Sequence, residues 1–415
     1  MKLLHTSDWH LGRLIETQPR LEEQAAFLEA LIDIAERESV DVVLVAGDVY
    51  DTYNPPARAE RLFFEKVKKL ADGGRRLIVI VSGNHDQPVR LGAAASWAAE
   101  HGVILCTDVT DQWEDQQIGR FRISGKGPGA LAVSVGDDAL DLALLPFPSE
   151  SRLGELMSLS GKEEELQLSY SERVKLLLQE RAAHFTDKTF GAVVSHLFVS
   201  GGELSDSERT LQWGGAYTVF GDAFPESANY VALGHLHKPQ SVAGLKGRGR
   251  YSGSPLQYSR SETGYAKSVT LIDTKAELPL EFQEHFIPLF KPIEIWHAGS
   301  FEEAEDCLIR QADRQAWVYL EIETGQPLTN GEIRRLKTLY PDLLSIEPIF
   351  PDQTGSVTGE VSLESMDVHE LFSRYYEREY GAPPDPELMI RFASLLRSED
   401  TEGESEGDAK GGEAV

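Results

Sequence analysis

Five short apolar runs in the sequence are each followed by side chains that can bind a metal ion or transfer a proton. These runs have the composition of buried strands, and they span residues 2–6, 41–46, 77–81, 190–195 and 230–233. A glycine or serine beside each polar group lets the backbone pass closely. A lone His or Asp after a strand is usually a turn residue, but five such groups in one chain indicate a functional site. The candidates are Asp8, His10, Asp48, Asp51, Asn84, His85, Asp86, His196, His235 and His237.

The chemistry of this set is that of a divalent metal centre. The carboxyl ends of the strands in an α/β sheet share one edge, so side chains that follow different strands can meet there. Imidazole, carboxylate and amide ligands without cysteine suit Mn²⁺, Fe²⁺ or Zn²⁺ rather than a structural zinc site. Seven of these ten side chains, taken as ligands, would exceed the needs of one ion, whereas two ions that share a carboxylate would use all seven. Two ions about 3.5–4 Å apart form a clamp that activates water and neutralises phosphate during phosphoester cleavage.

The elements that must position these side chains alternate between strand and helix patterns through residues 1–275. Near-continuous apolar strands joined by helices predict a sheet covered on both faces, and hence an α/β fold. Three further strands are expected at 103–105, 140–146 and 268–272. Helices are expected at 21–35, 61–70 and about 171–183.

The remainder of the chain divides into three parts. Residues 276–353 predict a small α+β domain, with strands at 293–296, 317–323 and 343–350 and helices at 301–312 and 331–339. Residues 354–397 combine a polar linker with two short amphipathic helices, 368–380 and 386–396, and Asp385 is the expected N-cap of the second. The tail 398–415 has the composition of a disordered acidic segment.

Composition limits the class of protein. The net charge of −28, of which the tail's seven acids and one lysine contribute −6, argues at face value against a nucleic-acid partner. Metal ions and a local basic groove can nevertheless supply the positive charge that DNA requires. The two cysteines are far apart in the sequence, which fits a reducing cytoplasm. We see neither a signal peptide nor an apolar stretch of the ~18 residues that a membrane span needs. We therefore expect a cytoplasmic protein without a membrane contact.

The motifs DWH, GDVYD, GNHD, SH and GHLH occur in this order, and in this the chain resembles the calcineurin-like metallophosphoesterases. The stretches HTSDWHLG, GDVYDTYNPP, LPFP and SGSPLQYSRSE, with the small second domain and paired C-terminal helices, are similar to the double-strand-break repair nucleases within that family. The resemblance covers the chain to about residue 397, with no motif position substituted. It implies a β-sandwich flanked by helices, a small capping domain that helps to hold DNA, and a C-terminal helical appendage.

The resemblance also implies a role for each site residue. Asp8, His10 and His237 would hold one metal ion, Asn84, His196 and His235 the other, and Asp48 would bridge the two. His85 would be the catalytic residue that contacts the scissile phosphate and protonates the departing oxygen, and Asp51 would orient it. For Asp51 and Asp86 the alternative is a turn residue that caps the backbone. His5, inside the first strand, is expected to be a structural core histidine.

The activities implied by the resemblance are those of a Mn²⁺-dependent nuclease subunit. It would act as a 3′→5′ exonuclease on duplex ends and an endonuclease on single strands, in DNA end processing, hairpin cleavage, recombination and repair. A coiled-coil ATPase would dock on the C-terminal helices, and the nuclease would be a homodimer within a heterotetramer. Since no GxxxxGK[ST] motif occurs, any ATP dependence must come from the partner.

Other interpretations remain open at this point. The apolar stripes of the two C-terminal helices could cover a core of their own rather than a partner. The same metal centre would serve a phosphatase or phosphodiesterase acting on a small molecule or a phosphoprotein. A binding scaffold with an inactive metal site would require a missing ligand, and none is missing. Loop residues that could contact DNA phosphates, none of them assigned, are Arg13, Tyr53, Asn54, Arg90 and Arg260.

Overall fold

The computed structural model describes residues 1–159, 169–208, 217–276 and 280–350, together with Phe372, Ser373, Tyr376, Pro384, Asp385, Leu388, Met389 and Phe392. The chain divides into two compact units. The first comprises Met1–Trp296, Gln311–Leu320 and Pro341–Ser345. The second comprises His297–Arg310, Glu321–Tyr340 and Ile346–Val415. No helix among the described residues is both long and apolar enough to span a membrane.

A six-stranded sheet forms one half of the first unit. Its order is β18-β17-β1-β4-β5-β6, and the four strands from β1 to β6 in that order run parallel. Buried β-branched and leucine side chains fill β4 and β5 along their whole length, as expected of central strands. The bounds are β1 Lys2–Thr6, β4 Val42–Ala46, β5 Leu77–Val81, β6 Val103–Cys106, β17 Ser268–Asp273 and β18 Gln283–Phe286.

An eight-stranded sheet forms the other half, in the order β15-β16-β14-β11-β10-β9-β8-β7. Strands β10, β11, β14 and β16 are parallel, whereas β7 to β10 form an antiparallel meander. The bounds are β7 Gln116–Ile118, β8 Phe121–Gly127, β9 Ala130–Val135, β10 Asp138–Leu145, β11 Phe190–His196, β14 Tyr230–Gly234, β15 Gln240–Ser241 and β16 Gly249–Tyr251.

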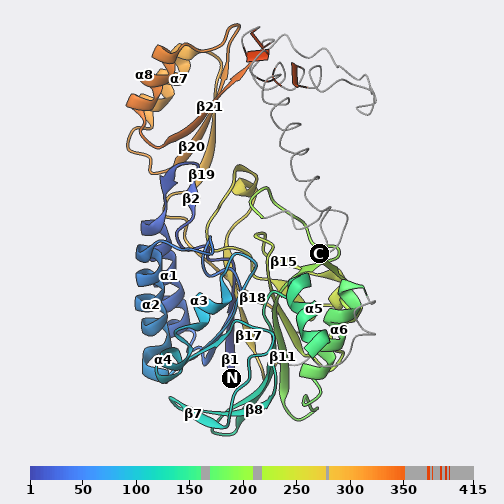
Figure 1. The fold of residues 1–415 in the computed structure, drawn as a ribbon. Coiled ribbons are helices and arrows are strands. Elements are labelled where there is room, and N and C mark those ends of the chain that lie inside the picture. Colours follow the sequence, from blue (N-terminus) through green and yellow to red (C-terminus); the bar gives the residue numbers. More distant parts are fainter. Residues whose placement is uncertain are drawn as a thin grey trace, which may run out of the picture. The chain divides into compact units, whose positions relative to one another are not determined.

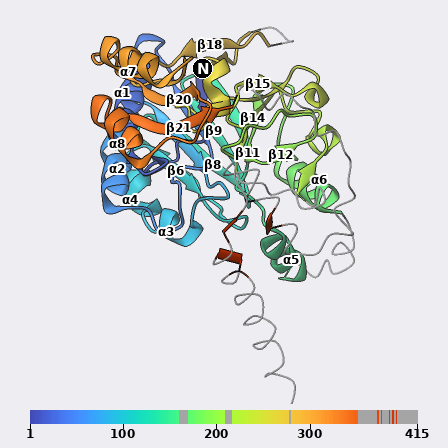
Figure 2. The same cartoon turned by 90° about the horizontal axis from the view of Figure 1, so that it is seen from above.

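The two sheets pack face to face, with helices on the outer face of each (Figures 1 and 2). Alternate residues of β4 face the two sides: Val42 and Leu44 lie in the core between the sheets, and Val43 and Val45 pack towards the helices. Helices α1 (Leu21–Arg37) and α2 (Ala57–Ala71) cover the first sheet, and α5 (Glu150–Leu159) and α6 (Tyr170–Arg181) cover the second. Two short helices are α3 Pro88–Gly92 and α4 Ala95–Glu100. Two short strand pairs are β2 Leu14–Ile15 with β3 Gln18–Pro19, and β12 Phe198–Val199 with β13 Thr218–Val219. The 3₁₀ turns are at Asp72–Gly74, Gly221–Ala223, Ala243–Leu245 and Arg260–Gly264.

The predicted α/β class and the β-sandwich flanked by helices are confirmed. The expected cover on both faces of the sheet is present in a form that the strand pattern alone did not specify: the strands divide between two sheets, and each sheet packs one face against the other sheet and one against helices. An apolar strand face looks the same in the sequence whether a helix or a second sheet covers it. The meander strands β7 to β9 were not predicted.

The α+β pattern expected after residue 290 is present. Strands β19 (Ile293–Ala298), β20 (Trp317–Glu323) and β21 (Leu343–Ile349) form a three-stranded sheet in that order. Helices α7 (Phe301–Arg310) and α8 (Asn330–Leu339) lie between them in the chain. A capping box starts α8, since the Thr329 side chain accepts a hydrogen bond from the Glu332 backbone N–H and Glu332 bonds back to Thr329.

The two predicted C-terminal helices and the acidic tail lie almost entirely outside the described residues. In the second helix, the backbone N–H of Leu388 donates to Asp385 Oδ1 at 3.2 Å, which is the predicted N-cap interaction. The rings of Phe372 and Phe392 stack with centroids 3.9 Å apart, and Ser373 Oγ lies 3.5 Å from Met389 Sδ. These contacts join the segment around Phe372 to the segment around Phe392.

Candidate metal centre

The candidate ligands meet where the carboxyl ends of five strands converge, β1, β4 and β5 from one sheet and β11 and β14 from the other. The backbone at Asp8, His10, Asp48 and His235 adopts positive φ angles of 55°, 45°, 49° and 113°. Such conformations are costly for residues other than glycine and concentrate at functional sites. All seven predicted ligands are buried.

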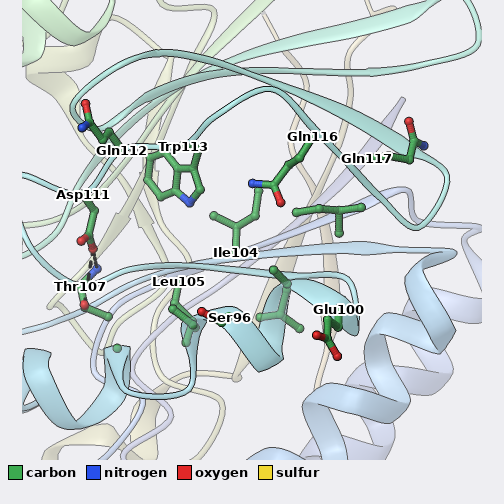
Figure 3. A pocket seen from close by; sticks show the side chains of 15 residues that line it. Ser96, Glu100, Ile104, Leu105, Thr107, Asp111, Gln112, Trp113, Gln116 and Gln117 are labelled. Carbon is green, nitrogen blue, oxygen red and sulfur yellow. Dashed lines mark hydrogen bonds between the residues drawn. The ribbon is translucent and has the colours of Figure 1, made fainter.

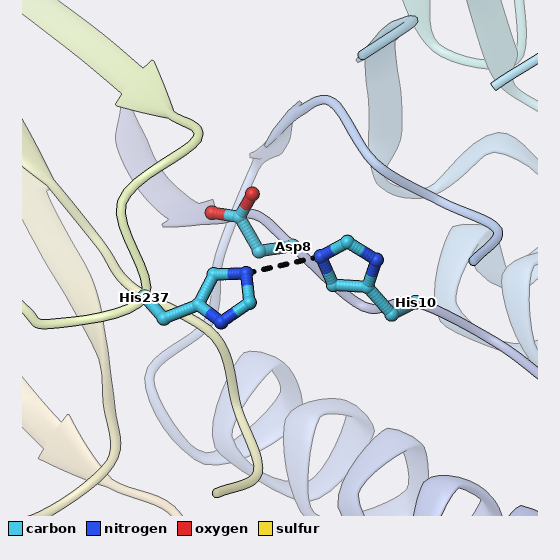
Figure 4. Close-up of side chains that lie close together, drawn as sticks. All are labelled: Asp8, His10 and His237. Carbon is cyan, nitrogen blue, oxygen red and sulfur yellow. Dashed lines mark hydrogen bonds between the residues drawn. The ribbon is translucent and has the colours of Figure 1, made fainter. Parts of the chain in front are cut away.

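One group of candidate ligands consists of Asp8, His10 and His237 (Figure 4). The Nε2 atoms of His10 and His237 face each other at 3.1 Å. Hydrogen bonds fix the Asp8 carboxylate: its Oδ2 accepts one from Ser7 Oγ at 2.6 Å. Its Oδ1 accepts another from the backbone N–H of His235 at 3.0 Å. Three ligand atoms from two sheets therefore converge on one point.

A second group consists of Asn84, His196 and His235. Asn84 Oδ1 lies 2.8 Å from His196 Nε2 and 3.2 Å from His235 Nδ1. His196 Nδ1 donates to the carbonyl oxygen of Ala46 at 2.9 Å. This bond places a proton on Nδ1, so Nε2 is the His196 nitrogen available to ligate a metal ion.

Asp48 lies between the two groups. Its Oδ2 is 3.6 Å from His10 Nε2 in the first group and 3.4 Å from His196 Nε2 in the second. Its Oδ1 accepts a hydrogen bond from the backbone N–H of His85 at 2.8 Å, which fixes the carboxylate. A single oxygen of Asp48 can thus serve both groups.

The electrostatics of the centre favour cations. Burial lowers the pKa of His10 and of His235 to about 3, so both rings are neutral at neutral pH and can ligate metal. Burial also raises the pKa of Asp8 to about 6. Burial would lower the pKa of His196, but the Asp48 carboxylate raises it to about 9, so a protonated imidazole balances that carboxylate in the absence of another cation.

The residues fit two divalent cations. The Nε2 atoms of His10 and His237 face each other at 3.1 Å, and two facing lone pairs cannot satisfy each other. Asn84 Oδ1, which is also an acceptor, lies 2.8 Å from His196 Nε2. A bound cation satisfies such a cluster of acceptors. The donor set of imidazole, carboxylate and amide oxygen is that of Mn²⁺, Fe²⁺ or Zn²⁺.

His85 lies beside this centre. Its Nε2 is 3.9 Å from Asp48 Oδ2, and its Nδ1 is 2.7 Å from the backbone carbonyl oxygen of Asp51. The Asp51 carboxylate is farther away, with Oδ1 3.9 Å from His85 Nδ1 and 3.5 Å from His10 Nδ1. The residue predicted to orient His85 therefore contacts it most closely through its main chain.

Two other sequence candidates have structural contacts. The Asp86 carboxylate accepts hydrogen bonds from the backbone N–H groups of Val49, Tyr50 and Gly83 at 3.1, 2.9 and 2.9 Å, which is the backbone-capping alternative. His5 is fully buried and its Nδ1 is 2.8 Å from Tyr230 Oη, as expected for a core histidine.

Arg13, one of the loop cations, lies beside the centre. Its Nη1 is 3.6 Å from Asp51 Oδ1, and its Nη2 donates to the carbonyl oxygen of Ser207 at 2.9 Å. Arg90 instead pairs with Glu60 at 2.8 Å.

A pocket of about 480 Å³ lies elsewhere in the first unit, among residues of α4, β6 and β7 (Figure 3). Its lining includes Trp113 and Gln116, and an Asp111 carboxylate that accepts a hydrogen bond from the Thr107 backbone N–H at 2.7 Å. None of the seven candidate ligands lines it, so it is separate from the metal centre.

Comparison with known proteins identifies the class to which this site belongs. Residues 1–239 match the family model described as calcineurin-like phosphoesterase, and residues 289–380 match one described as type 5 capsule protein repressor C-terminal domain. The chain belongs to the calcineurin-like phosphoesterases, and it is a metal-dependent hydrolase. The family implies a centre for two divalent metal ions.

A curated relative narrows this assignment. The SbcD subunit of the nuclease SbcCD from Bacillus subtilis (strain 168) is 37% identical over 412 residues, covering 99% of this chain and 100% of the relative. Within the phosphoesterases the chain therefore belongs to the SbcD family, and the resemblance seen in the sequence motifs is confirmed.

The close approach of Gly83 to Asp48 leads to a first prediction. A Cβ atom on Gly83 would lie 2.1 Å from Asp48 Oδ1 and 2.3 Å from the Asp48 backbone nitrogen, so Gly83→Ala must displace Asp48. We expect Mn²⁺ affinity, measured by calorimetric titration of the metal-free protein, to fall about 10-fold or more. Gly154→Ala is the control, because its Cβ meets nothing within 4 Å. Wild-type affinity in Gly83→Ala would show that the position of Asp48 does not matter for metal binding.

Proposed function

We propose that this protein is a Mn²⁺-dependent DNA nuclease subunit. It acts as a 3′→5′ exonuclease on duplex ends and as an endonuclease on single strands. It works with an SMC-like ATPase of the SbcC type in DNA end processing, hairpin cleavage, recombination and repair. The full-length similarity to a protein named as a nuclease subunit supports DNA as the substrate.

The observation that carries the proposal is the position of Asp48 between two groups of ligands. Asp8, His10 and His237 would hold one ion, and Asn84, His196 and His235 the other, with Asp48 as the shared ligand. Two divalent cations bound in this way supply an activated water and neutralise the charge of the phosphodiester. The distances of 3.6 and 3.4 Å from Asp48 Oδ2 to imidazoles of the two groups support this arrangement.

His85 is the proposed general acid. The Asp51 carbonyl oxygen can only accept a hydrogen bond, so His85 Nδ1 must carry its proton at this 2.7 Å contact. Consequently Nε2, the nitrogen nearer to Asp48, is the atom that gains and loses a proton. In its protonated form it can donate to the oxygen that leaves the scissile phosphate.

The other parts of the chain have proposed roles in substrate and partner binding. Residues 1–275 would form the dimetal nuclease domain, 276–353 the capping domain that helps to hold DNA, and 354–397 the segment that binds the ATPase. We propose a homodimer within a heterotetramer, located in the cytoplasm with the nucleoid. The extension of the similarity over 99% of the chain supports these roles.

Cleavage of labelled DNA tests the function. The protein is incubated with Mn²⁺ and a linear duplex carrying a 5′ label, with and without a purified SbcC-type ATPase and ATP, and in parallel with p-nitrophenyl phosphate. We expect progressive shortening from the 3′ end that requires the ATPase, and only weak hydrolysis of the small ester. Fast hydrolysis of p-nitrophenyl phosphate without any cleavage of DNA would instead favour a phosphatase.

A truncation tests the role of the C-terminal segment. Deleting residues 366–415 leaves every proposed ligand in place, because the last of them is His237. The truncated protein should keep Mn²⁺-dependent cleavage of single-stranded DNA and lose association with the ATPase in a pull-down. Deleting only 398–415 is the control and should change neither property, since that tail offers almost no apolar surface. Binding of the ATPase by the 366–415 deletion at wild-type affinity would place the docking site elsewhere.

A further inference from the structure

A buried ion pair lies behind the ligand His237. Glu262 and Lys267 both have 0% exposed side chains, and the ammonium of Lys267 donates to Glu262 Oε2. Lys267 Nζ also donates to the carbonyl oxygen of His237 at 3.0 Å and to Ser254 Oγ at 2.8 Å. Charged side chains are rarely buried this completely without a specific role or partner. Neither residue is among the candidate ligands, and sequence reasoning gave neither a function.

The pair connects to the imidazole of His237 through Ser207. The hydroxyl of Ser207 donates to Glu262 Oε1, and Ser207 Oγ lies 2.5 Å from His237 Nδ1. Glu262 Oε1 is itself 3.3 Å from His237 Nδ1. Glu208 fixes the backbone at the same place, where its Oε1 accepts a hydrogen bond from the His237 N–H at 2.7 Å. His237 is therefore held at both its main chain and its ring.

These contacts select one tautomer of His237. An ionised carboxylate can only accept hydrogen bonds, so the single hydroxyl proton of Ser207 goes to Glu262. Ser207 Oγ must then accept a hydrogen bond from His237 Nδ1, which requires a proton on Nδ1. The direct contact between His237 Nδ1 and Glu262 Oε1 requires a proton on Nδ1 as well. The lone pair consequently stays on Nε2, the nitrogen that faces His10 Nε2 at 3.1 Å. This is the tautomer that a metal ligand needs.

The ammonium of Lys267 explains how a carboxylate can be kept ionised in this position. An isolated charge without contact with water is very costly, whereas a hydrogen-bonded pair of opposite charges is tolerated. The pair is neutral overall, so it orients the ring without adding net charge to the centre. His196 obtains the same orientation from a backbone carbonyl, that of Ala46, which substitution cannot remove. The side chains that orient His237, in contrast, can be replaced by mutation, so their role can be tested.

We propose that Glu262, balanced by Lys267 and acting through Ser207, is a positioning residue for the metal centre. It keeps His237 in the tautomer that ligates through Nε2, and so sets the affinity of the site formed by Asp8, His10 and His237. The inference rests on the ligand assignment in the proposed function, but not on DNA being the substrate.

The test uses the double variant Glu262→Gln/Lys267→Met, which removes both charges together and leaves no unpaired buried ion. Mn²⁺ is titrated calorimetrically into the metal-free full-length protein. One of the two binding steps should weaken about 10–100-fold while the other keeps its affinity. Glu150→Gln/Arg173→Met is the matched control, because this ion pair joins α5 and α6 and touches none of the ligands.

A spectroscopic readout separates positioning from a general loss of structure. In ¹⁵N-histidine-labelled metal-free protein, the His237 ring nitrogens should report the Nδ1–H tautomer in the wild type and a mixture of tautomers in the double variant. Ser207→Ala, which keeps the buried pair intact, is a second variant in case the first does not fold, and should give a smaller shift in the same direction. Unchanged affinity of both steps, or equal weakening of both with the tautomer preserved, would overturn the proposal. Tight binding of two ions without DNA cleavage would count against the proposed function alone.

Discussion

Replacing His85 by Ala is expected to reduce DNA cleavage by about 10²–10⁴-fold, the usual cost of losing a general acid. The same variant should still bind two Mn²⁺ ions. The His85 imidazole donates a hydrogen bond from Nδ1 to the carbonyl oxygen of Asp51, and its Nε2 lies 3.9 Å from Asp48 Oδ2. It therefore lies beside the ligand groups, and its loss removes a proton donor while the ligands remain.

Cleavage rates measured with saturating Mn²⁺, together with the metal content of the purified variant, test this role. Asp51→Asn is an informative comparison, because it keeps the main-chain carbonyl that holds His85. We expect it to lose less activity than His85→Ala. Near-normal cleavage by a His85→Ala protein that contains both metals would remove this residue from catalysis.

The second large effect is expected for Asp48→Asn. One oxygen of this carboxylate faces imidazoles of both groups, at 3.6 and 3.4 Å, and its charge offsets part of the repulsion between two cations. Burial alone would raise the pKa of Asp48, but the imidazoles of His196 and His85 hold it well below its usual range, so the ionised form is the native one. The neutral amide should weaken both Mn²⁺-binding steps and abolish measurable cleavage.

Asn84→Ala provides the contrast for this variant. Asn84 contacts His196 and His235 but is not positioned between the two groups, so its loss should weaken chiefly one binding step. Calorimetric titration of both variants under the same conditions compares the steps directly. If Asp48→Asn binds two ions with wild-type affinity, Asp48 does not bridge.

Much of the candidate centre could be predicted from the sequence because its candidate ligands follow apolar strands directly. The run Leu77–Val81 predicted a buried strand, and the structure places β5 at the same residues, with Asn84 and His85 just beyond it. Parallel strands bring their carboxyl ends together, and this rule anticipated that side chains far apart in the chain would meet. It did not reveal that β11 and β14 belong to a second sheet, since the apolar pattern is the same in either case.

The contacts behind the ligands were not predictable in this way. Glu262 lies in the stretch SGSPLQYSRSE, which was noted only for its resemblance to the family. A glutamate in a Ser-rich loop is normally exposed, and only the tertiary fold brings Lys267 and Ser207 to it. Likewise, the sequence placed Asp51 near His85 but could not indicate that the closest contact would be made by a main-chain carbonyl oxygen.

The dimetal centre itself is tested most directly by anomalous diffraction from crystals of the protein grown with Mn²⁺. We expect two anomalous peaks about 3.5–4 Å apart. One should lie among Asp8, His10 and His237, the other among Asn84, His196 and His235, with a carboxylate oxygen of Asp48 between them. A single peak, or two peaks that do not share Asp48, would show that Asp48 does not bridge two metal ions.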